Sequence, residues 1–169
     1  MEGVQPKKKH KDAPFNDNGD LIKTCFSYNH PVNKFASNFY SDANLPIKIW
    51  GKEHSSPEKF LANKKAEWMK DPLLEEMLAE DDPYKLKRLH GRVKWTGGLT
   101  SWTVFAFELI GTANEAKFRQ NQTLRKRLFA MAGLLVESNT GKSQWSCGLK
   151  RTDSMLSDRT QWPLQIIVF

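Results

Sequence analysis

The stretch SSPEKFLANKKA, residues 55–66, places Glu58 among three lysines. On an α-helix, residues three, four and seven apart share a face, so Glu58 and Lys65 would lie two turns apart on one stripe. Leu61 and Ala62 lie on the same stripe, which is therefore partly apolar and should face inward. A charge pair on an inward face must be paired or serve a site, which makes Glu58 a candidate acid or base.

The same spacing also has a purely structural explanation. A glutamate in the first turn of a helix is stabilised by the helix dipole. Lys65 can bury its carbon stem and keep its ammonium group at the rim. Spacing alone leaves both interpretations of Glu58 open.

The chain carries no motif for a metal site, a standard phosphate-binding loop or an α/β-hydrolase nucleophile. The four histidines are scattered and the two cysteines form no CxxC pair, so we expect no metal site. Neither standard phosphate-binding loop is present, and the GKS in ESNTGKSQW lacks the upstream glycine of a P-loop. The GxSxG element of α/β-hydrolases is also missing. We therefore expect no cofactor.

Helix signals dominate the elements that must position Glu58. Ser55 or Ser56 can cap a helix that has Pro57 in its first turn and runs to about Met69. Further helices are predicted over residues 72–80, 83–91 (stopped by Gly91), 100–116 and 121–133, the last capped by Asn121. Short strands are predicted over 21–28, 47–51, 134–138 and 164–169. The expected fold class is mainly α with a few short β-strands (α+β), in one compact domain.

Composition agrees with a packed domain that carries a basic arm. Apolar residues make up 39% and aromatic residues 11% of the 169 residues, enough for one real core. We expect residues 1–20 to form a flexible basic arm and residues 21–169 a single domain. The net charge of +7 suits a phosphate-bearing partner, although a solvated basic surface explains it too.

The chain has neither a membrane-span pattern nor a signal-peptide pattern. No apolar run approaches the roughly 20 residues that a membrane span needs. No hydrophobic run follows the basic N-terminal stretch. We expect an intracellular, cytoplasmic protein without membrane involvement. The basic run Lys7–Lys11 also resembles a nuclear import signal.

Several motifs, in order, resemble the NADAR (YbiA-like) family, named for its links to NAD and ADP-ribose. FASNFY and the following IKIWGKEHSSPEKFLANKKA look like its Ser-Asn-Phe element and its Ser-x-Glu-x-x-x-x-x-x-Lys helix. KRLHGR resembles its Lys/Arg-x-x-Gly-Arg element, with one residue more between Leu89 and Gly91. EAKFRQNQTLRKRLFAMAG resembles its Lys-Phe-x-Gln-Asn helix, and LLVESNTGKSQWSCGL its Leu-Val-Glu strand and Trp-Gly-x-Gly turn. The resemblance is clearest over residues 35–149.

The resemblance implies a compact, largely helical YbiA-like fold whose cleft binds an ADP-ribose-like or ribosyl-phosphate ligand. Characterised members resemble N-glycosidases that hydrolyse phosphorylated riboflavin-pathway intermediates or remove ADP-ribose from guanine. Glu58 would then be the base or electrostatic stabiliser, and Lys65 would orient it or meet phosphate. The implied ligand-binding residues are Asn38, Phe39, Arg92, Lys117, Lys142, Trp145 and Gly148.

Three departures from the family pattern separate two hypotheses. Lys142 occupies the position of the family's aspartate, Ser146 replaces a glycine of the turn, and residues 153–169 do not resemble the family's closing helix. The first hypothesis is an N-glycosidase, and the second is an inactive module that binds ADP-ribose or a nucleotide. A third hypothesis, a basic nucleic-acid-binding protein, has no RNP, KH or helix-turn-helix motif behind it.

The partner that these hypotheses imply carries a phosphate. It would be a phosphorylated ribosyl or ADP-ribosyl small molecule, or an ADP-ribosylated nucleic acid. The family resemblance implies either kind of ligand, and the net charge of +7 is compatible with both.

Overall fold

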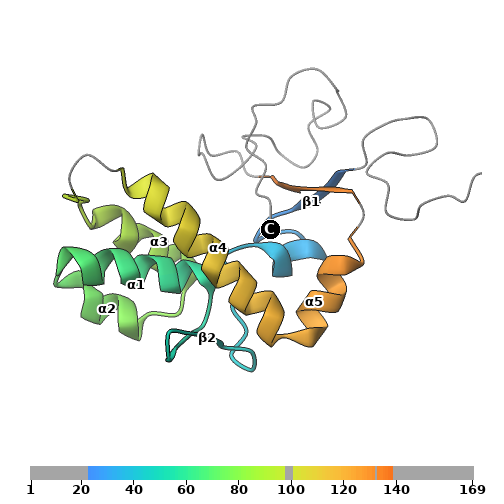
Figure 1. Cartoon of the computed structure of the whole chain (residues 1–169), viewed down its shortest axis with the longest axis horizontal. Helices are drawn as coiled ribbons and strands as arrows, with labels where there is room; N and C mark the ends of the chain where they lie inside the picture. Colours follow the sequence, from blue (N-terminus) through green and yellow to red (C-terminus); the bar gives the residue numbers. More distant parts are fainter. Residues whose placement is uncertain (1–22, 98–100, 132, 139–169) are drawn as a thin grey trace, which may run out of the picture. The chain divides into compact units, whose positions relative to one another are not determined.

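The computed structural model describes residues 23–97, 101–131 and 133–138 (Figure 1). Residues 26–129 belong to one unit, and the described residues among 23–25 and 130–138 belong to another. In chain order the elements are β1 (Lys23–Phe26), the 3₁₀ helix η1 (Asn33–Ala36), β2 (Ile47–Ile49), β3 (Lys52–His54), α1 (Pro57–Met69), α2 (Leu73–Ala79), α3 (Pro83–Arg92), α4 (Trp102–Gln120), α5 (Gln122–Phe129) and β4 (Leu134–Glu137). Strand β1 pairs with β4, and β2 with β3.

Helix α1 begins and ends on strong local signals. The Ser56 hydroxyl accepts a hydrogen bond from the Lys59 backbone N–H at 3.1 Å, and Pro57 follows in the first turn. At the other end Lys70 adopts a left-handed conformation, and its N–H bonds back to Ala66 and Glu67. The bounds predicted for this helix are confirmed, with Ser56 as the cap.

One hydrophobic core cluster lies between α1, α2 and α3. Its buried members are Ala62, Ala66, Met77, Leu86, Leu89 and Val93. The two alanines of α1 allow α2 and α3 to approach closely, and the larger side chains of α2 and α3 fill the space. Figure 1 shows these three helices side by side with α4 crossing them. One inward face of α1 therefore becomes inaccessible to solvent, together with any charged group on it.

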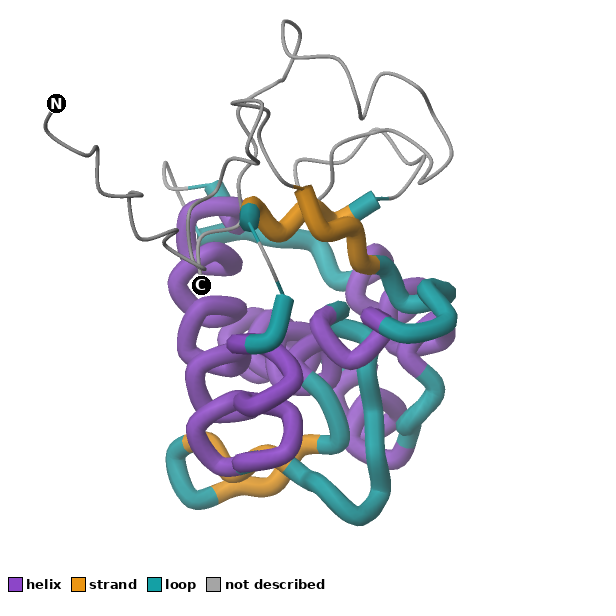
Figure 2. The backbone as a smooth tube through the Cα atoms, turned by 90° about the vertical axis from the view of Figure 1, so that its right-hand side faces the viewer, coloured by secondary structure: helices purple, strands orange, loops and turns teal. Residues whose placement is uncertain are grey.

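Helix α4 packs on α1 and on the hairpin of β2 and β3 (Figure 2). The hairpin pairs Ile47 with His54 and turns at Trp50 and Gly51, both with positive φ. The Gln120 side chain, at the end of α4, accepts from the Lys48 N–H at 2.8 Å and donates to the Lys48 carbonyl at 2.7 Å. This pair of bonds fixes the end of α4 against the sheet edge.

The predicted fold class is confirmed, but four details were wrong. Helix α5 ends at Phe129 and not at residue 133 as predicted. Helix α3 continues through Gly91 to Arg92, and Val93 ends it in an extended conformation. A glycine in the last turn costs only about 1 kcal/mol. Helix α4 runs from Trp102 to Gln120 and so begins and ends later than predicted. Its last turn carries the buried Lys117 and Phe118. Strand β3 and η1 were not predicted, and the strand predicted over 164–169 lies outside the described residues.

Asn121 caps α5 as predicted, with its side-chain oxygen accepting from the Leu124 N–H at 2.9 Å. None of the helices that the structure describes is both long enough and apolar enough to cross a membrane.

Candidate active site

Glu58 is buried at the first turn of α1. Its residue exposure is 8%, and its carboxylate Oε1 lies 3.4 Å from Nδ1 of His90, a long hydrogen bond. The backbone N–H of Glu58 donates to the carbonyl of Asn38 at 3.1 Å. First-turn N–H groups have no partner inside the helix, so Asn38 satisfies one of them. The carboxylate therefore lies inside the molecule, and its hydrogen-bond partner comes from α3 and not from the solvent.

Lys65 lies two turns further along α1 and is buried to the same extent. Its Nζ donates to the His90 carbonyl at 3.3 Å and lies 5.5 Å from the centre of the Trp102 ring. Burial lowers the pKa of the Lys65 ammonium below its ordinary value. In the part of the chain that the structure describes, no ion pair joins Lys65 to Glu58. Its charge is thus met by a carbonyl dipole and an aromatic ring.

His90 connects these two side chains, and sequence reasoning missed it. Its ring contacts Glu58, and its carbonyl accepts from Lys65. The ring packs edge-on against Trp102 at 5.7 Å. Its Nε2 is buried and has no hydrogen-bond partner among the described residues. The four histidines are scattered in the sequence, so none of them was predicted as a site residue. The available signal was the extra residue in KRLHGR, which is His90 itself.

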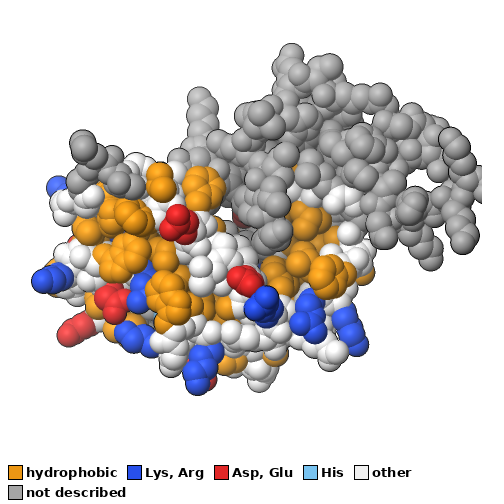
Figure 3. Space-filling model, in the orientation of Figure 1, with side chains coloured by type: hydrophobic (Ala, Val, Ile, Leu, Met, Phe, Trp, Pro, Cys, Tyr) orange, Lys and Arg blue, Asp and Glu red, His pale blue; other side chains and the backbone are white. Residues whose placement is uncertain are grey.

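A cluster of aromatic rings continues from Trp102. Trp68, Trp95 and Phe105 complete it, with ring centres between 5.3 and 6.3 Å apart in the contacting pairs. Trp68 remains 41% exposed. Figure 3 shows hydrophobic side chains gathered on the face where α4 begins. The polar group of Glu58, Lys65 and His90 therefore borders an aromatic surface that solvent can reach.

Asn38 and Lys117 are brought to this region from distant parts of the chain. The Asn38 side-chain oxygen accepts from the Asn114 amide at 2.9 Å, and Lys117 Nζ donates to the Ser37 carbonyl at 2.8 Å. Lys117 is only 2% exposed. Its ammonium group therefore anchors the segment that presents Asn38 to α1, and α4 supplies that anchor.

Phe39 and Arg92 have different surroundings. The Phe39 ring packs against Tyr28 and Tyr84, each at 6.0 Å, with Lys87 Nζ 5.2 Å from its centre. Arg92 is exposed at the end of α3. The other predicted ligand residues, Lys142, Trp145 and Gly148, lie outside the described residues. A common cleft that joins Glu58 and Lys65 to Phe39 and Trp145 remains a prediction.

Among the described residues, no group of three or more histidine, cysteine, aspartate or glutamate side chains could hold a metal ion. The side chains that meet at Glu58 are instead a carboxylate, an imidazole, an ammonium group and an indole. This set can exchange protons, bind phosphate and contact an aromatic ring.

Comparison with known proteins identifies the family and the fold of the chain. A family model described as the NADAR domain matches residues 20–163. The chain belongs to the NADAR family. A solution NMR structure of the Escherichia coli protein YbiA is similar in fold, with a TM-score of 0.58 and 25% sequence identity over 75% of this chain and 72% of that one. The search of curated proteins returned no match. Membership of the NADAR family and the YbiA-like fold are thus both established.

Proposed function

We propose that this NADAR protein is an N-glycosidase that hydrolyses the N-glycosidic bond of a ribosyl-phosphate or ADP-ribosyl substrate. The observation that carries the proposal is the meeting of the buried Glu58 and Lys65 at the half-buried His90, beside Trp102. A carboxylate that is buried in the first turn of one helix and bonded to an imidazole from another is typical of a site rather than of a solvated helix face. Family membership supports the same class of chemistry.

The reaction needs a negative charge and a base in one place. As the bond between the ribose C1′ and the base nitrogen breaks, positive charge develops on the sugar, and a carboxylate stabilises it. Water then forms the new C1′–O bond, and one of its protons passes to the Glu58 carboxylate. That proton is afterwards passed to the departing nitrogen, which restores the carboxylate. Glu58 is the residue at the site that can perform both tasks.

His90 and Lys65 act through Glu58 and through the substrate. The His90 Nδ1–H can donate to the carboxylate and fix its orientation. The Lys65 ammonium, held at the His90 carbonyl, offers a positive charge for a substrate phosphate. The aromatic cluster at Trp102 offers rings against which a nucleobase can stack.

The direct test is product release from two substrate classes. Purified protein is incubated with ADP-ribosylated DNA and with phosphorylated ribosyl-pyrimidines, and products are followed by mass spectrometry. Wild-type protein should release product from at least one class, and Glu58→Gln should not. Glu53→Gln is the matched control, because Glu53 is an exposed glutamate on β3. Equal release by wild type and Glu58→Gln would contradict the proposal.

A binding-only module is the second candidate, and Lys142 is the observation in its favour. A lysine at the family's aspartate position would repel the positive charge that develops on the sugar and attract phosphate. Lys142→Asp should then raise any hydrolysis rate and weaken ADP-ribose binding by about 1–3 kcal/mol. If wild type only binds ADP-ribose and the substitution restores release, the module hypothesis is correct for the natural protein. If the substitution changes neither quantity, Lys142 lies outside the site.

A further inference from the structure

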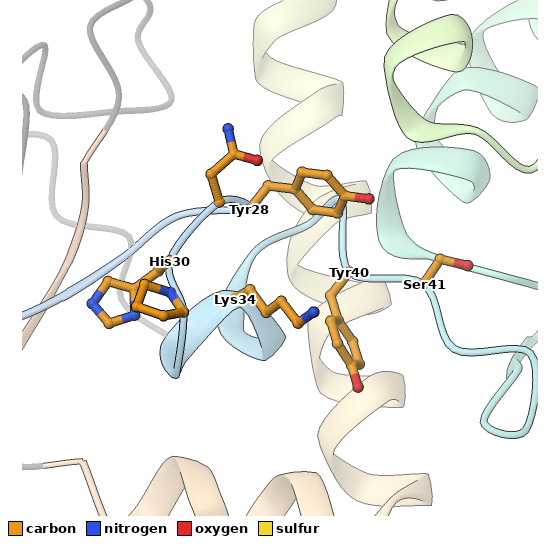
Figure 4. Close-up of a pocket in the computed structure, with 7 residues that line it drawn as sticks. Tyr28, His30, Lys34, Tyr40 and Ser41 are labelled. Carbon is orange, nitrogen blue, oxygen red and sulfur yellow. The ribbon is translucent and has the colours of Figure 1, made fainter.

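A polar pocket of about 320 Å³ opens beside the segment that carries Asn38 (Figure 4). Its walls come from the turn after β1, from η1 and from the residues that follow Phe39. The lining residues are Tyr28, Asn29, His30, Pro31, Lys34, Tyr40 and Ser41. None of them was predicted as a site residue. The volume lies within the range of pockets that hold small ligands.

The pocket is rich in hydrogen-bond donors. Figure 4 shows the Lys34 side chain extending from η1 toward Tyr40. In the part of the chain that the structure describes, Lys34 forms no ion pair. The Asn29 side-chain oxygen accepts from the Tyr84 hydroxyl at 3.2 Å, which leaves the Asn29 amide N–H₂ as a donor. The Ser41 hydroxyl adds a further polar group. Such a lining suits an anion.

Two positive charges and one negative charge lie around Tyr40. Lys117 Nζ lies 5.4 Å from the Tyr40 ring, and the positive charge of Arg127 also acts on Tyr40. Asp42 is the nearby carboxylate, and it accepts the Tyr40 hydroxyl at 3.4 Å and the Asn44 N–H at 3.0 Å. Burial, with a smaller contribution from Asp42, raises the pKa of Tyr40 above its ordinary value, so its hydroxyl stays neutral and donates to Asp42.

Two tyrosine rings give the pocket an aromatic part. The Tyr28 ring is supported edge-on by Phe39 at 6.0 Å and by Tyr84 at 5.3 Å. Tyr40 is held by its bond to Asp42. Rings that are braced in this way can contact a nucleobase without losing much side-chain freedom. An ammonium group next to braced aromatic rings is the combination that recognises a nucleoside phosphate.

The pocket is also linked to Glu58 through one short segment. Asn38 accepts the Glu58 N–H, and the next residue, Phe39, supports Tyr28. We infer that the Tyr28–Tyr40 pocket binds the phosphate-and-base end of a nucleotide ligand, with phosphate at Lys34. This deepens the proposed function, on which it rests for the assumption that the same ligand presents its glycosidic bond to Glu58. Binding energy from such a remote end helps to position the reacting bond.

The pocket can be tested by binding alone, with ADP as the probe. ADP should bind the wild-type protein, and Lys34→Glu should raise its Kd by at least about tenfold, since a charge-assisted contact is replaced by repulsion. Lys48→Glu is the matched control, an exposed lysine on β2 that takes the same change of charge and should leave Kd unchanged. Lys34→Gln gives an intermediate case. Unchanged thermal midpoints show that the variants are folded.

The outcomes separate the pocket from the catalytic proposal. Adenosine and inorganic pyrophosphate should each bind at least about tenfold more weakly than ADP, because each supplies only half of the contacts. Three results would contradict the proposal that the pocket binds a nucleotide. They are equal affinity for pyrophosphate and ADP, no binding of ADP, and equal effects of Lys34→Glu and Lys48→Glu on Kd. If Lys34→Glu loses ADP binding and the wild type hydrolyses no substrate, the nucleotide-binding proposal is supported and the proposed N-glycosidase function is contradicted. Hydrolysis whose KM is unchanged in Lys34→Glu would exclude the pocket as part of that substrate site.

Discussion

Lys59 and Lys65 lie on the same helix and are almost equally buried, at 9% and 8% exposure, yet their surroundings differ completely. On one side of α1, Lys59 Nζ lies 2.8 Å from a carboxylate oxygen of Asp81, and the hydrogen bond from Lys59 lowers the pKa of that carboxyl group. On the other side, Lys65 donates to the His90 carbonyl and faces Trp102. Both sides of α1 therefore bury a lysine, and the two sides differ in the group that the lysine ammonium contacts.

The difference shows how a structural ion pair can be told from a candidate site. Lys59 and Asp81 neutralise each other, and Asp81 is largely exposed, so this pair needs no ligand. Glu58 and Lys65 are both buried on the other side but form no ion pair with each other in the described residues. Opposite charges held apart inside a protein remain available to a substrate. We therefore expect substitutions on the Lys65 side to change activity and those on the Lys59 side to change stability.

The largest effect is expected at Glu58. Glu58→Gln keeps the size of the side chain and removes its charge, so the hydrolysis rate should fall by about 10²–10⁴-fold, the usual contribution of a catalytic base. Asp81→Asn, the corresponding change on the other side, should leave the rate within about twofold. Steady-state rates for both variants measure this. A similar loss in the two variants would show that the two sides do not differ in function.

A smaller effect is expected when the two lysines are each replaced by methionine. Lys65→Met should lower kcat/KM by about 10²-fold, because a charged contact to a substrate phosphate is lost. Its stability should change little, since an apolar chain suits the ring of Trp102. Lys59→Met should lower the free energy of unfolding by about 1 kcal/mol and leave kcat/KM unchanged. The reverse pattern, measured by urea unfolding and kinetics, would mean that the ion pair is on the functional side.

The Lys59 side should also make stability depend on pH. Burial lowers the pKa of His54 to about 4, and the charges of Lys64, Lys59 and Lys52 act in the same direction. The unfolded chain, with an ordinary histidine pKa near 6.5, binds the proton more tightly. Stability from neutral His54 is therefore complete above about pH 6.5 and is lost as the pH falls toward 4, by about 1–2 kcal/mol after allowance for solvent screening.

Urea unfolding at several pH values checks the His54 prediction. His54→Leu removes the titrating group, so this part of the slope between pH 4 and 6.5 should disappear. An unchanged slope in His54→Leu would assign it to other groups.

The smallest effect is expected from the His90 ring. His90→Leu should lower kcat by about tenfold or less, because the bond to Glu58 is long and the Glu58 charge remains. KM should stay nearly constant, since the backbone carbonyl that holds Lys65 is still present. His90→Asn offers an amide donor and should recover part of the rate. No recovery with Asn at unchanged stability would show that the ring does not orient Glu58.

Local sequence signals determined much of the scaffold. Ser56, Pro57 and the residues after them predicted the start of α1, because capping depends on neighbouring residues alone. The spacing of Glu58 and Lys65 predicted a common inward stripe for the same reason. The order of the motifs identified the family, which the family model confirmed. Gly91 was misread as a stop, because a glycine usually ends a helix by adopting a left-handed conformation, and Gly91 has no positive φ.

The partners of those side chains were decided by the tertiary structure. His90 lies 32 residues from Glu58 in sequence, and Asn114 lies 76 residues from Asn38, so no local periodicity could reveal either contact. The sequence also did not show that Lys59 meets Asp81 while Lys65 meets a carbonyl, although both lie on α1. The packing of α1 against α2 and α3 supplies different neighbours on each side, and these contacts form only when distant segments come together.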